Sequence, residues 1–156
     1  MKHIIKHYEE RYFIGVEVEG GVDFDSLASI QTLWDTFLTE DMKLIADAPI
    51  TTKCIGLECY PPDFMETRSF DYFALVQTER LIHRDGFVSK KLPAGNYISF
   101  PIEFDHIRDG IQRVYNYLRD QDIAVHMAFD FEDYLEEQDY TKPGAILHFS
   151  FLLEEK

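Results

Sequence analysis

The sequence lacks most features that mark a secreted, membrane-spanning or nucleotide-binding protein. The first ten residues contain no apolar run that could act as a signal peptide, and no segment reaches membrane-spanning length. There is no Gly-rich phosphate loop, dinucleotide fingerprint or Gly-x-Ser-x-Gly elbow. We therefore expect a cytoplasmic protein and disfavour both nucleotide chemistry and serine-type hydrolysis.

Basic residues are also few. Fifteen Lys and Arg face 29 Asp and Glu, which gives a formal net charge of −14. Such a field repels phosphate backbones and anionic membrane surfaces, so direct binding to nucleic acid or to membranes is not expected. The acidic balance is explained either by solubility alone or by a cationic ligand or a basic protein partner.

Candidate metal and disulfide residues are sparse. The two cysteines, Cys54 and Cys59, fall in one predicted strand on opposite faces, so they cannot easily form a disulfide. Free thiols fit a reducing compartment. His3 and His7 have helical spacing but precede a strand, and no further ligand motif completes a site. We predict neither a metal nor a cofactor.

Aromatic residues, in contrast, are abundant. The chain has 13 Phe and 9 Tyr in 156 residues, and 46% of its residues are hydrophobic. This length suits a single domain with its own core. The number of rings exceeds what a small core requires, so some of them can line a cavity or an interface.

Hydrophobic periodicity divides the first half into four elements. Alternation over residues 12–19 predicts a half-buried strand, and Gly20-Gly21 ends it. Apolar residues at three- and four-residue steps after that, including Ile30 and Trp34, predict a helix with one buried face. Residues 54–60 and 70–78 are typical of two further strands, separated by a turn at Pro61-Pro62.

The second half repeats this order. A basic stretch over residues 80–92 is interpreted as a crossover linker. A turn predicted at Gly95-Asn96 leads into a strand through Phe104. A helix then follows from Ile107 to Leu118, with ideal spacing for one buried face. Two more strands follow at 125–135 and 145–153. We interpret this as an internal duplication, with repeat one at about 8–79 and repeat two at about 93–156.

The predicted fold is therefore α+β: two strand-helix-strand-strand units related by pseudo-twofold symmetry. Their strands form an antiparallel sheet with the helices packed on it. A groove between the repeats is the expected place for a ligand.

Two short motifs carry a family resemblance that covers nearly the whole chain. The run Leu92-Pro93-Ala94-Gly95-Asn96-Tyr97 resembles the Ile-Pro-Ala-Gly-x-Tyr entry to the second repeat of GyrI-like domains, the effector-binding domains of AraC- and MerR-type bacterial activators. Phe131-Glu132-Asp133-Tyr134 resembles the Phe-Glu-x-Tyr strand of that family. The chain departs from the family at residues 102–106, where His106 can substitute for a tyrosine, and at Tyr72-Phe73, where an acidic residue is missing.

The resemblance implies an aromatic pocket between the repeats, with Glu132 as the carboxylate that meets cationic or polar ligands. Alternation places Tyr134 and Asp130 on the same strand face as Glu132. The complete set of candidate ligand-binding residues is Glu132, Tyr134, Trp34, Tyr60, Tyr97 and His106. Each has a structural alternative, because Trp34 and the tyrosines fit a core equally well and the acidic run fits a solvated face.

Three functions remain open from the sequence. The leading hypothesis is a stand-alone domain that binds a hydrophobic, cationic small molecule. The alternatives are an acidic protein-interaction module of the gyrase-inhibitor type and a hydrolase of electrophilic small molecules in which Glu132 activates water. No catalytic residue is assigned.

Overall fold

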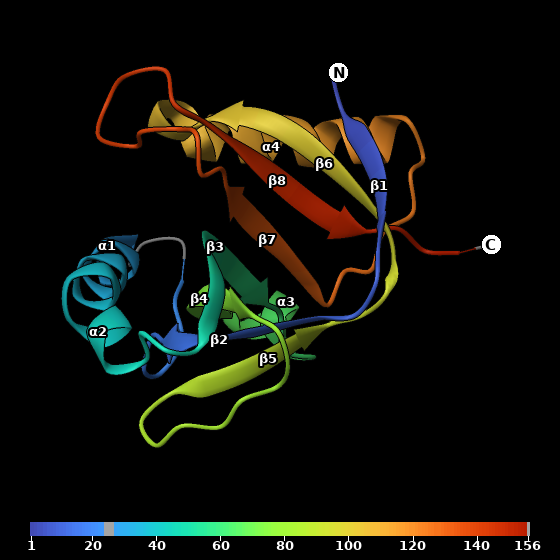
Figure 1. Ribbon diagram of the computed structural model, residues 1–156. Coiled ribbons are helices and arrows are strands. Elements are labelled where there is room, and N and C mark those ends of the chain that lie inside the picture. The colour runs from blue at the N-terminus through green and yellow to red at the C-terminus, as the bar shows by residue number, and fades with distance from the viewer. Residues whose placement is uncertain (24–26, 156) are drawn as a thin grey trace.

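The chain folds around one curled antiparallel sheet (Figure 1). The computed structural model describes residues 1–23 and 27–155. Across the sheet the strand order is β1-β6-β8-β7-β3-β4-β2-β5. The strands are β1 (Ile4–Tyr8), β2 (Arg11–Glu17), β3 (Pro49–Cys59), β4 (Asp71–Thr78), β5 (Val88–Leu92), β6 (Gly95–Glu103), β7 (Phe129–Tyr134) and β8 (Ile146–Leu152).

Helices cover one face of this sheet, near its two ends. In the first half α1 (Leu27–Thr36) continues through the π-helical turn η1 (Phe37–Asp41) into α2 (Met42–Leu44), and α3 (Phe64–Thr67) follows β3. In the second half the 3-10 turn η2 (Phe104–His106) leads into α4 (Ile107–Asp120). Figure 1 shows α1 and α4 far apart, each beside the strands of its own half.

The strand order reads the same from either end when the two halves are exchanged, which confirms the duplication and its pseudo-twofold symmetry. Each repeat, however, begins with one more short strand than the sequence pattern indicated. β1 pairs with β6 of the second repeat, and β5 pairs with β2 of the first. The 80–92 segment is thus only partly a linker, because β5 occupies its end. These two edge strands are too short and too polar to show clear alternation.

The two faces of the sheet are both buried in part. On the face without helices, rings and aliphatic side chains such as Phe13, Leu57 and Phe131 form a closed core. On the other face, α4 packs on β6 and β8, and α1 with η1 packs on β2 and β4. Strand β2 contributes Phe13 to one core and Ile14 to another, so the prediction that it would be half-buried is wrong.

The repeats meet where β3 lies beside β7. Ile55 pairs with Asp133, Gly56 with Glu132, and Glu58 with Asp130. Because α1 and α4 each cover the strands of their own half, the helix-bearing face of β3 and β7 forms the floor between them. No helix in the described parts of the chain is long and apolar enough to cross a membrane.

Candidate ligand-binding site

A cavity of about 1110 Å³ lies on the β3–β7 floor between the two halves. Binding sites for small molecules commonly have volumes of about 300–1,000 Å³ and mostly apolar walls, so this cavity can hold a drug-sized ligand. Its aromatic lining comes from both repeats and consists of Trp34, Tyr60, Phe64, Phe70, Phe104, Tyr115, Tyr134 and Tyr140. A cavity is thus present between the repeats, and aromatic side chains are part of its lining.

Charge in the lining is predominantly negative. The acidic lining residues are Asp35, Glu58, Glu132 and Glu136, whereas Arg108 on α4 is the one basic residue among the described lining side chains. Glu136 belongs to the rim, where Thr51 donates a 2.6 Å hydrogen bond to its carboxylate. Glu58 and Glu132 are both about 94% buried, at 6% exposure each, and belong to the floor.

Four of the six residues predicted from the sequence line this cavity: Trp34, Tyr60, Glu132 and Tyr134. Glu132 and Tyr134 come from β7, which presents alternate residues to the cavity. Trp34 lies in α1 with its ring 5.3 Å from that of Tyr134, measured between centroids. The two repeats therefore contribute to one wall.

The other two predicted residues, Tyr97 and His106, lie elsewhere, so their expected placement beside the groove is wrong. Tyr97 sits on the helix-free face of β6, in the core with Phe131, and its hydroxyl donates to the carbonyl of Pro93 at 2.7 Å. His106 is exposed in η2, 4.0 Å from the carboxylate of Glu103. The sequence motif located both near the second repeat but could not fix the face on which each would lie.

Glu132 is held by two hydroxyl donors, one from β4 and one from its own strand β7. Its Oε1 accepts hydrogen bonds from Tyr72 at 2.7 Å and from Tyr134 at 2.9 Å. The Tyr72 hydroxyl in turn accepts a bond from Trp34 Nε1 at 2.8 Å. Since both phenols bond Oε1, Oε2 is the oxygen that remains for a third partner.

Asp130 forms a second, parallel arrangement one step along the same face. Its Oδ2 accepts hydrogen bonds from Tyr60, at 2.9 Å, and from Tyr115 of α4. Its Oδ1 is buried without a hydrogen-bond partner among the described residues. Tyr72 and Tyr115 thus each donate a hydrogen bond to a buried carboxyl group, Tyr72 to Glu132 and Tyr115 to Asp130.

Glu58 is a cavity-lining carboxyl that the sequence interpretation missed. It faces the cavity from β3, directly opposite Asp130 on β7. A signal was available: Glu58 is the one charged residue between Cys54 and Tyr60, and alternation puts it on the same face as both of them. A lone carboxylate in an otherwise apolar buried strand calls for a specific partner or function.

Gly56 makes the hydrogen bond between Tyr72 and Glu132 possible. It stands opposite Glu132 in the ladder, and a Cβ atom there would overlap the Tyr72 hydroxyl and lie 2.5 Å from Glu132 Oε1. Glycine in a strand interior often marks such a close approach. The sequence therefore leaves out a side chain where the site needs space.

Burial dominates the titration of this cluster. It raises the pKa of Glu58 well above its ordinary value, and the neighbouring charges of Asp130 and Glu132 raise it further. Burial also raises the pKa values of Asp130 and Glu132, but hydrogen bonds from Glu58 and from the phenols oppose that effect. No Lys, Arg or His of the described residues is among the main causes of these three shifts.

Other reactive groups near the cavity do not form a recognisable centre. Cys54 lines the cavity, but burial raises the pKa of its thiol to about 11, so the nucleophilic thiolate is scarce at neutral pH. Within the described residues, no group of three or more His, Cys, Asp or Glu is arranged to hold a metal ion.

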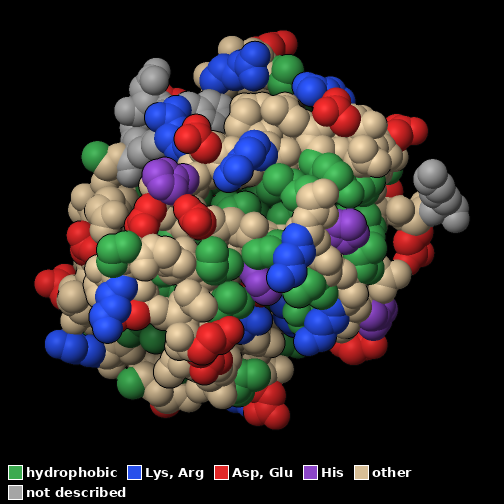
Figure 2. Space-filling view, turned by 90° about the horizontal axis from the view of Figure 1, so that it is seen from above, with side chains coloured by type: hydrophobic (Ala, Val, Ile, Leu, Met, Phe, Trp, Pro, Cys, Tyr) green, Lys and Arg blue, Asp and Glu red, His purple; other side chains and the backbone are tan. Residues whose placement is uncertain are grey.

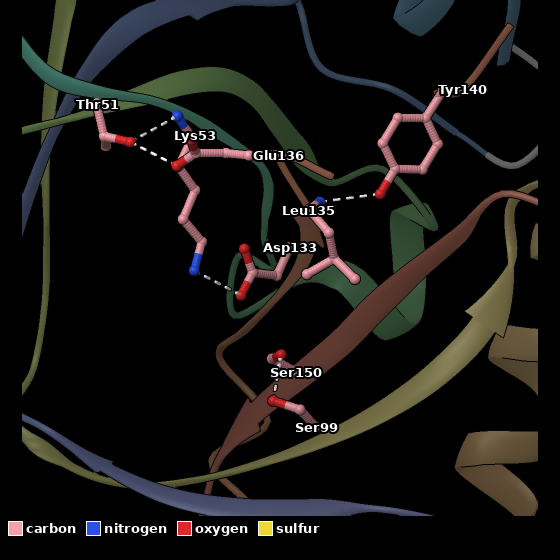
Figure 3. Close-up of polar contacts among 8 residues, drawn as sticks. All are labelled: Thr51, Lys53, Ser99, Asp133, Leu135, Glu136, Tyr140 and Ser150. Carbon is pink, nitrogen blue, oxygen red and sulfur yellow. Dashed lines mark hydrogen bonds and ion pairs between the residues drawn. The ribbon is translucent and has the colours of Figure 1, made fainter. Parts of the chain in front are cut away.

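Asp133, the residue after Glu132 on β7, lies on the opposite face of the strand. It points away from the cavity, and Lys53 Nζ lies 3.3 Å from its carboxylate (Figure 3). Asp133 thus has a basic partner of its own, which Glu132 lacks.

The curled sheet, the pseudo-twofold arrangement and the cavity between the repeats together define a GyrI-like, small-molecule-binding domain of the effector-binding class. The family of Cass2, the integron-associated effector binding protein, matches residues 4–146. The chain therefore belongs to this family, and the resemblance inferred from the two motifs is confirmed. Comparison with curated protein sequences gave no significant match.

Solved structures with low sequence identity share the fold. SAV2435 bound to tetraphenylphosphonium has a TM-score of 0.76 at 15% identity, over 99% of this chain and 94% of that one. The C-terminal domain of EcmrR gives 0.70 at 14% identity, over 99% and 98% of the two chains. The Vibrio cholerae integron cassette protein Cass2 gives 0.65 at 20% identity, over 97% and 95%.

Proposed function

We propose that this domain binds a hydrophobic aromatic cation in the cavity, with Glu132 as the charge partner. The observation that carries the proposal is a buried carboxylate cluster, without a basic partner among the described residues, at the floor of a cavity lined by rings. A carboxylate removed from water gains much when a cation arrives, and aromatic faces add attraction for the same charge.

The shape of the site supports an aromatic ligand. Its rings come from several elements and meet mostly edge to face, as Trp34 does with Tyr134 at an interplanar angle of 72°. Such a lining offers both ring faces and edges to an aromatic guest. SAV2435, whose fold this chain shares, was solved with an aromatic phosphonium cation.

The face of the molecule shown in Figure 2 gives less support to a purely electrostatic protein-binding role. In Figure 2 acidic and basic side chains are interspersed around exposed hydrophobic ones. Charges of mixed sign produce a weaker directed field than a continuous acidic patch would. The cavity, in contrast, concentrates one sign of charge.

Trp34 provides a direct measurement, because it is the single tryptophan of the chain and lines the cavity. We expect tetraphenylphosphonium to change its fluorescence at saturable concentrations. Tetraphenylborate has nearly the same shape with the opposite charge, so it is the matched probe and should bind far more weakly. Equal affinity for the two ions, or no binding of either, would refute the proposal.

The charge partner is tested by two neutralising variants on adjacent residues. Glu132→Gln should weaken binding of the cation by about 1–3 kcal/mol, or roughly 5- to 150-fold. Asp133→Asn changes the net charge equally, but on the face that points away from the cavity, and should leave the affinity nearly unchanged. If both variants weaken binding equally, general surface charge rather than Glu132 attracts the ligand.

A further inference from the structure

Glu58 differs from the two carboxylates beside it in what it can hydrogen-bond. Asp130 accepts bonds from Tyr60 and Tyr115, and Glu132 accepts bonds from Tyr72 and Tyr134. Among the described residues no phenol donates a hydrogen bond to Glu58, and the groups that act on its charge are the carboxyls of Asp130 and Glu132. Two carboxyl groups can share a hydrogen bond only if one of them carries a proton.

The ladder register brings these three carboxyls together. Glu58 is directly opposite Asp130, and Glu132 is the next cavity-facing residue along β7. Directly opposed side chains in an antiparallel pair have Cβ atoms about 4.5–5.5 Å apart, so ionising both at once is unfavourable. The Asp130 Oδ1 atom is buried and lacks a donor among the described residues, as expected where a neighbouring carboxyl must supply the proton.

The surroundings make Glu58 the natural holder of that proton. Two phenols stabilise the anionic form of each neighbour, whereas burial and both neighbouring charges oppose ionisation of Glu58. The phenols themselves stay protonated, because burial raises the pKa of every one of them: Tyr60, Tyr72, Tyr115 and Tyr134.

The more distant charged groups of the cavity do not change this assignment. Asp35 from α1, Glu136 after β7 and Arg108 from α4 also line it. All three are exposed to solvent, which screens their charges from the floor. None of them is among the main causes of the raised pKa of Glu58.

We propose that Glu58 determines which ligand charge the cavity accepts: it keeps its proton when the cavity is empty or holds a neutral ligand, and releases it when a cation binds. This inference rests on the proposed function of the same cavity. In the exchange the O–H bond of Glu58 breaks, the proton passes to water, and the new carboxylate faces the cation. One positive charge enters as another leaves, so the buried charge of the complex equals that of the empty site.

The consequence for specificity is a broad ligand class. A floor with permanently ionised carboxylates would reject neutral aromatic molecules, because it would remain unpaired beneath them. A floor that holds one exchangeable proton carries less charge under a neutral guest. Aromatic cations and neutral aromatic molecules of similar shape should therefore share the site, whereas aromatic anions should not.

Calorimetry on the unaltered protein tests the exchange directly. Titrations with tetraphenylphosphonium at about pH 7, in buffers of different ionisation enthalpy, give the number of protons released per cation bound. We expect a release approaching one proton, and an affinity that rises with pH by up to about tenfold per unit. Triphenylphosphine oxide, a neutral probe of similar rings, should bind with no release.

Two variants assign the proton. Glu58→Gln should abolish most of the release and flatten the pH dependence of cation affinity, whereas Asp133→Asn, on the opposite face of β7, should preserve both. Full release from Glu58→Gln would overturn the assignment to this residue. The wild-type titration needs no variant, so a folding defect in Glu58→Gln would leave the test intact.

The possible failures are distinguishable. Tight cation binding without proton release overturns the exchange and leaves the proposed function standing. Proton release by the neutral probe likewise overturns it. Failure of the cation to bind at any pH removes the proposed function itself.

Discussion

The two faces of β7 surround adjacent buried residues with different kinds of groups. Phe131 is buried in a closed core of rings and aliphatic side chains, whereas Glu132 lies at the floor of a cavity and is held by hydroxyl groups. Both are almost fully buried, at 1% and 6% exposure. Burial alone therefore does not distinguish the stabilising face from the binding face; the difference lies in what surrounds the buried atom.

Polar groups show the same contrast. On the helix-free face, Arg11 stacks against Tyr8, with the guanidinium carbon 3.7 Å from the ring centroid, and Asp133 has Lys53 beside it. On the helix-bearing face, the carboxylates have only phenols and each other. On the helix-free face Arg11 and Asp133 thus lie beside a ring or a basic group, whereas the carboxyls of the helix-bearing face have no basic partner among the described residues.

The largest expected effect comes from a substitution on the helix-free face of the sheet. Phe131→Ala should lower the free energy of unfolding by about 3–5 kcal/mol, since it leaves a cavity in a packed core. Urea denaturation followed by Trp34 fluorescence measures this loss. Cation affinity of the folded fraction should change little, and a large loss of affinity without a loss of stability would break the division between the faces.

Gly56→Ala should act on both properties. The added methyl group overlaps the Tyr72 hydroxyl and Glu132 Oε1, so the strand or the tyrosine must shift. We expect a loss of about 1–3 kcal/mol in stability and a weaker cation affinity, because the hydrogen bond that orients Glu132 is lost. Unfolding and fluorescence titrations on the same sample check the two effects, and unchanged affinity would show that this bond does not position the carboxylate.

Glu58→Gln should change how stability depends on pH. The pKa of Glu58 is raised in the folded protein, so the folded state holds a proton that the unfolded chain has lost above about pH 4.3. Its contribution is present below that pH and is lost as pH rises through the folded pKa, by up to about 1.4 kcal/mol per pH unit. The stability of the variant relative to the wild type should therefore increase as pH rises. Urea midpoints of the two proteins that change equally with pH would contradict this.

Tyr97→Phe should have the smallest effect. It removes one hydrogen bond to the carbonyl of Pro93 on the helix-free face, at a cost of about 0.5–1.5 kcal/mol in stability. Cation affinity should be the same as in the wild type. A weaker affinity would instead support Tyr97 as a ligand-binding residue. It would also show that a change on the helix-free face affects binding on the other face.

Much of the architecture was predictable because it rests on local periodicity. The helix at 107–118, the six longer strands and their repeat order follow from apolar spacing, and Glu132 and Tyr134 follow from a motif on one strand. β1 and β5 were not predicted, because a five-residue strand at a sheet edge carries little alternation. Their partners are also distant in sequence.

The site was harder to predict than the fold. Glu58 joins the carboxyl cluster only because register places it opposite Asp130, and register between strands some seventy residues apart is a tertiary property. The predicted placement of Tyr97 beside the groove was wrong for a related reason: alternation fixes which residues share a face, but not which face bears the helices. Trp34 and Tyr60 were placed correctly because each follows a feature readable in the sequence, a helix stripe and a strand end.

The exchanged edge strands also determine how the halves depend on each other. Each repeat lends its opening strand to the other, so neither could be cut away without leaving its counterpart's sheet unfinished. A chain consisting of one such unit could complete the same sheet only as a strand-swapped homodimer. Fusing two units into one polypeptide frees them to diverge, and so a symmetric scaffold can carry an asymmetric set of acids on its floor.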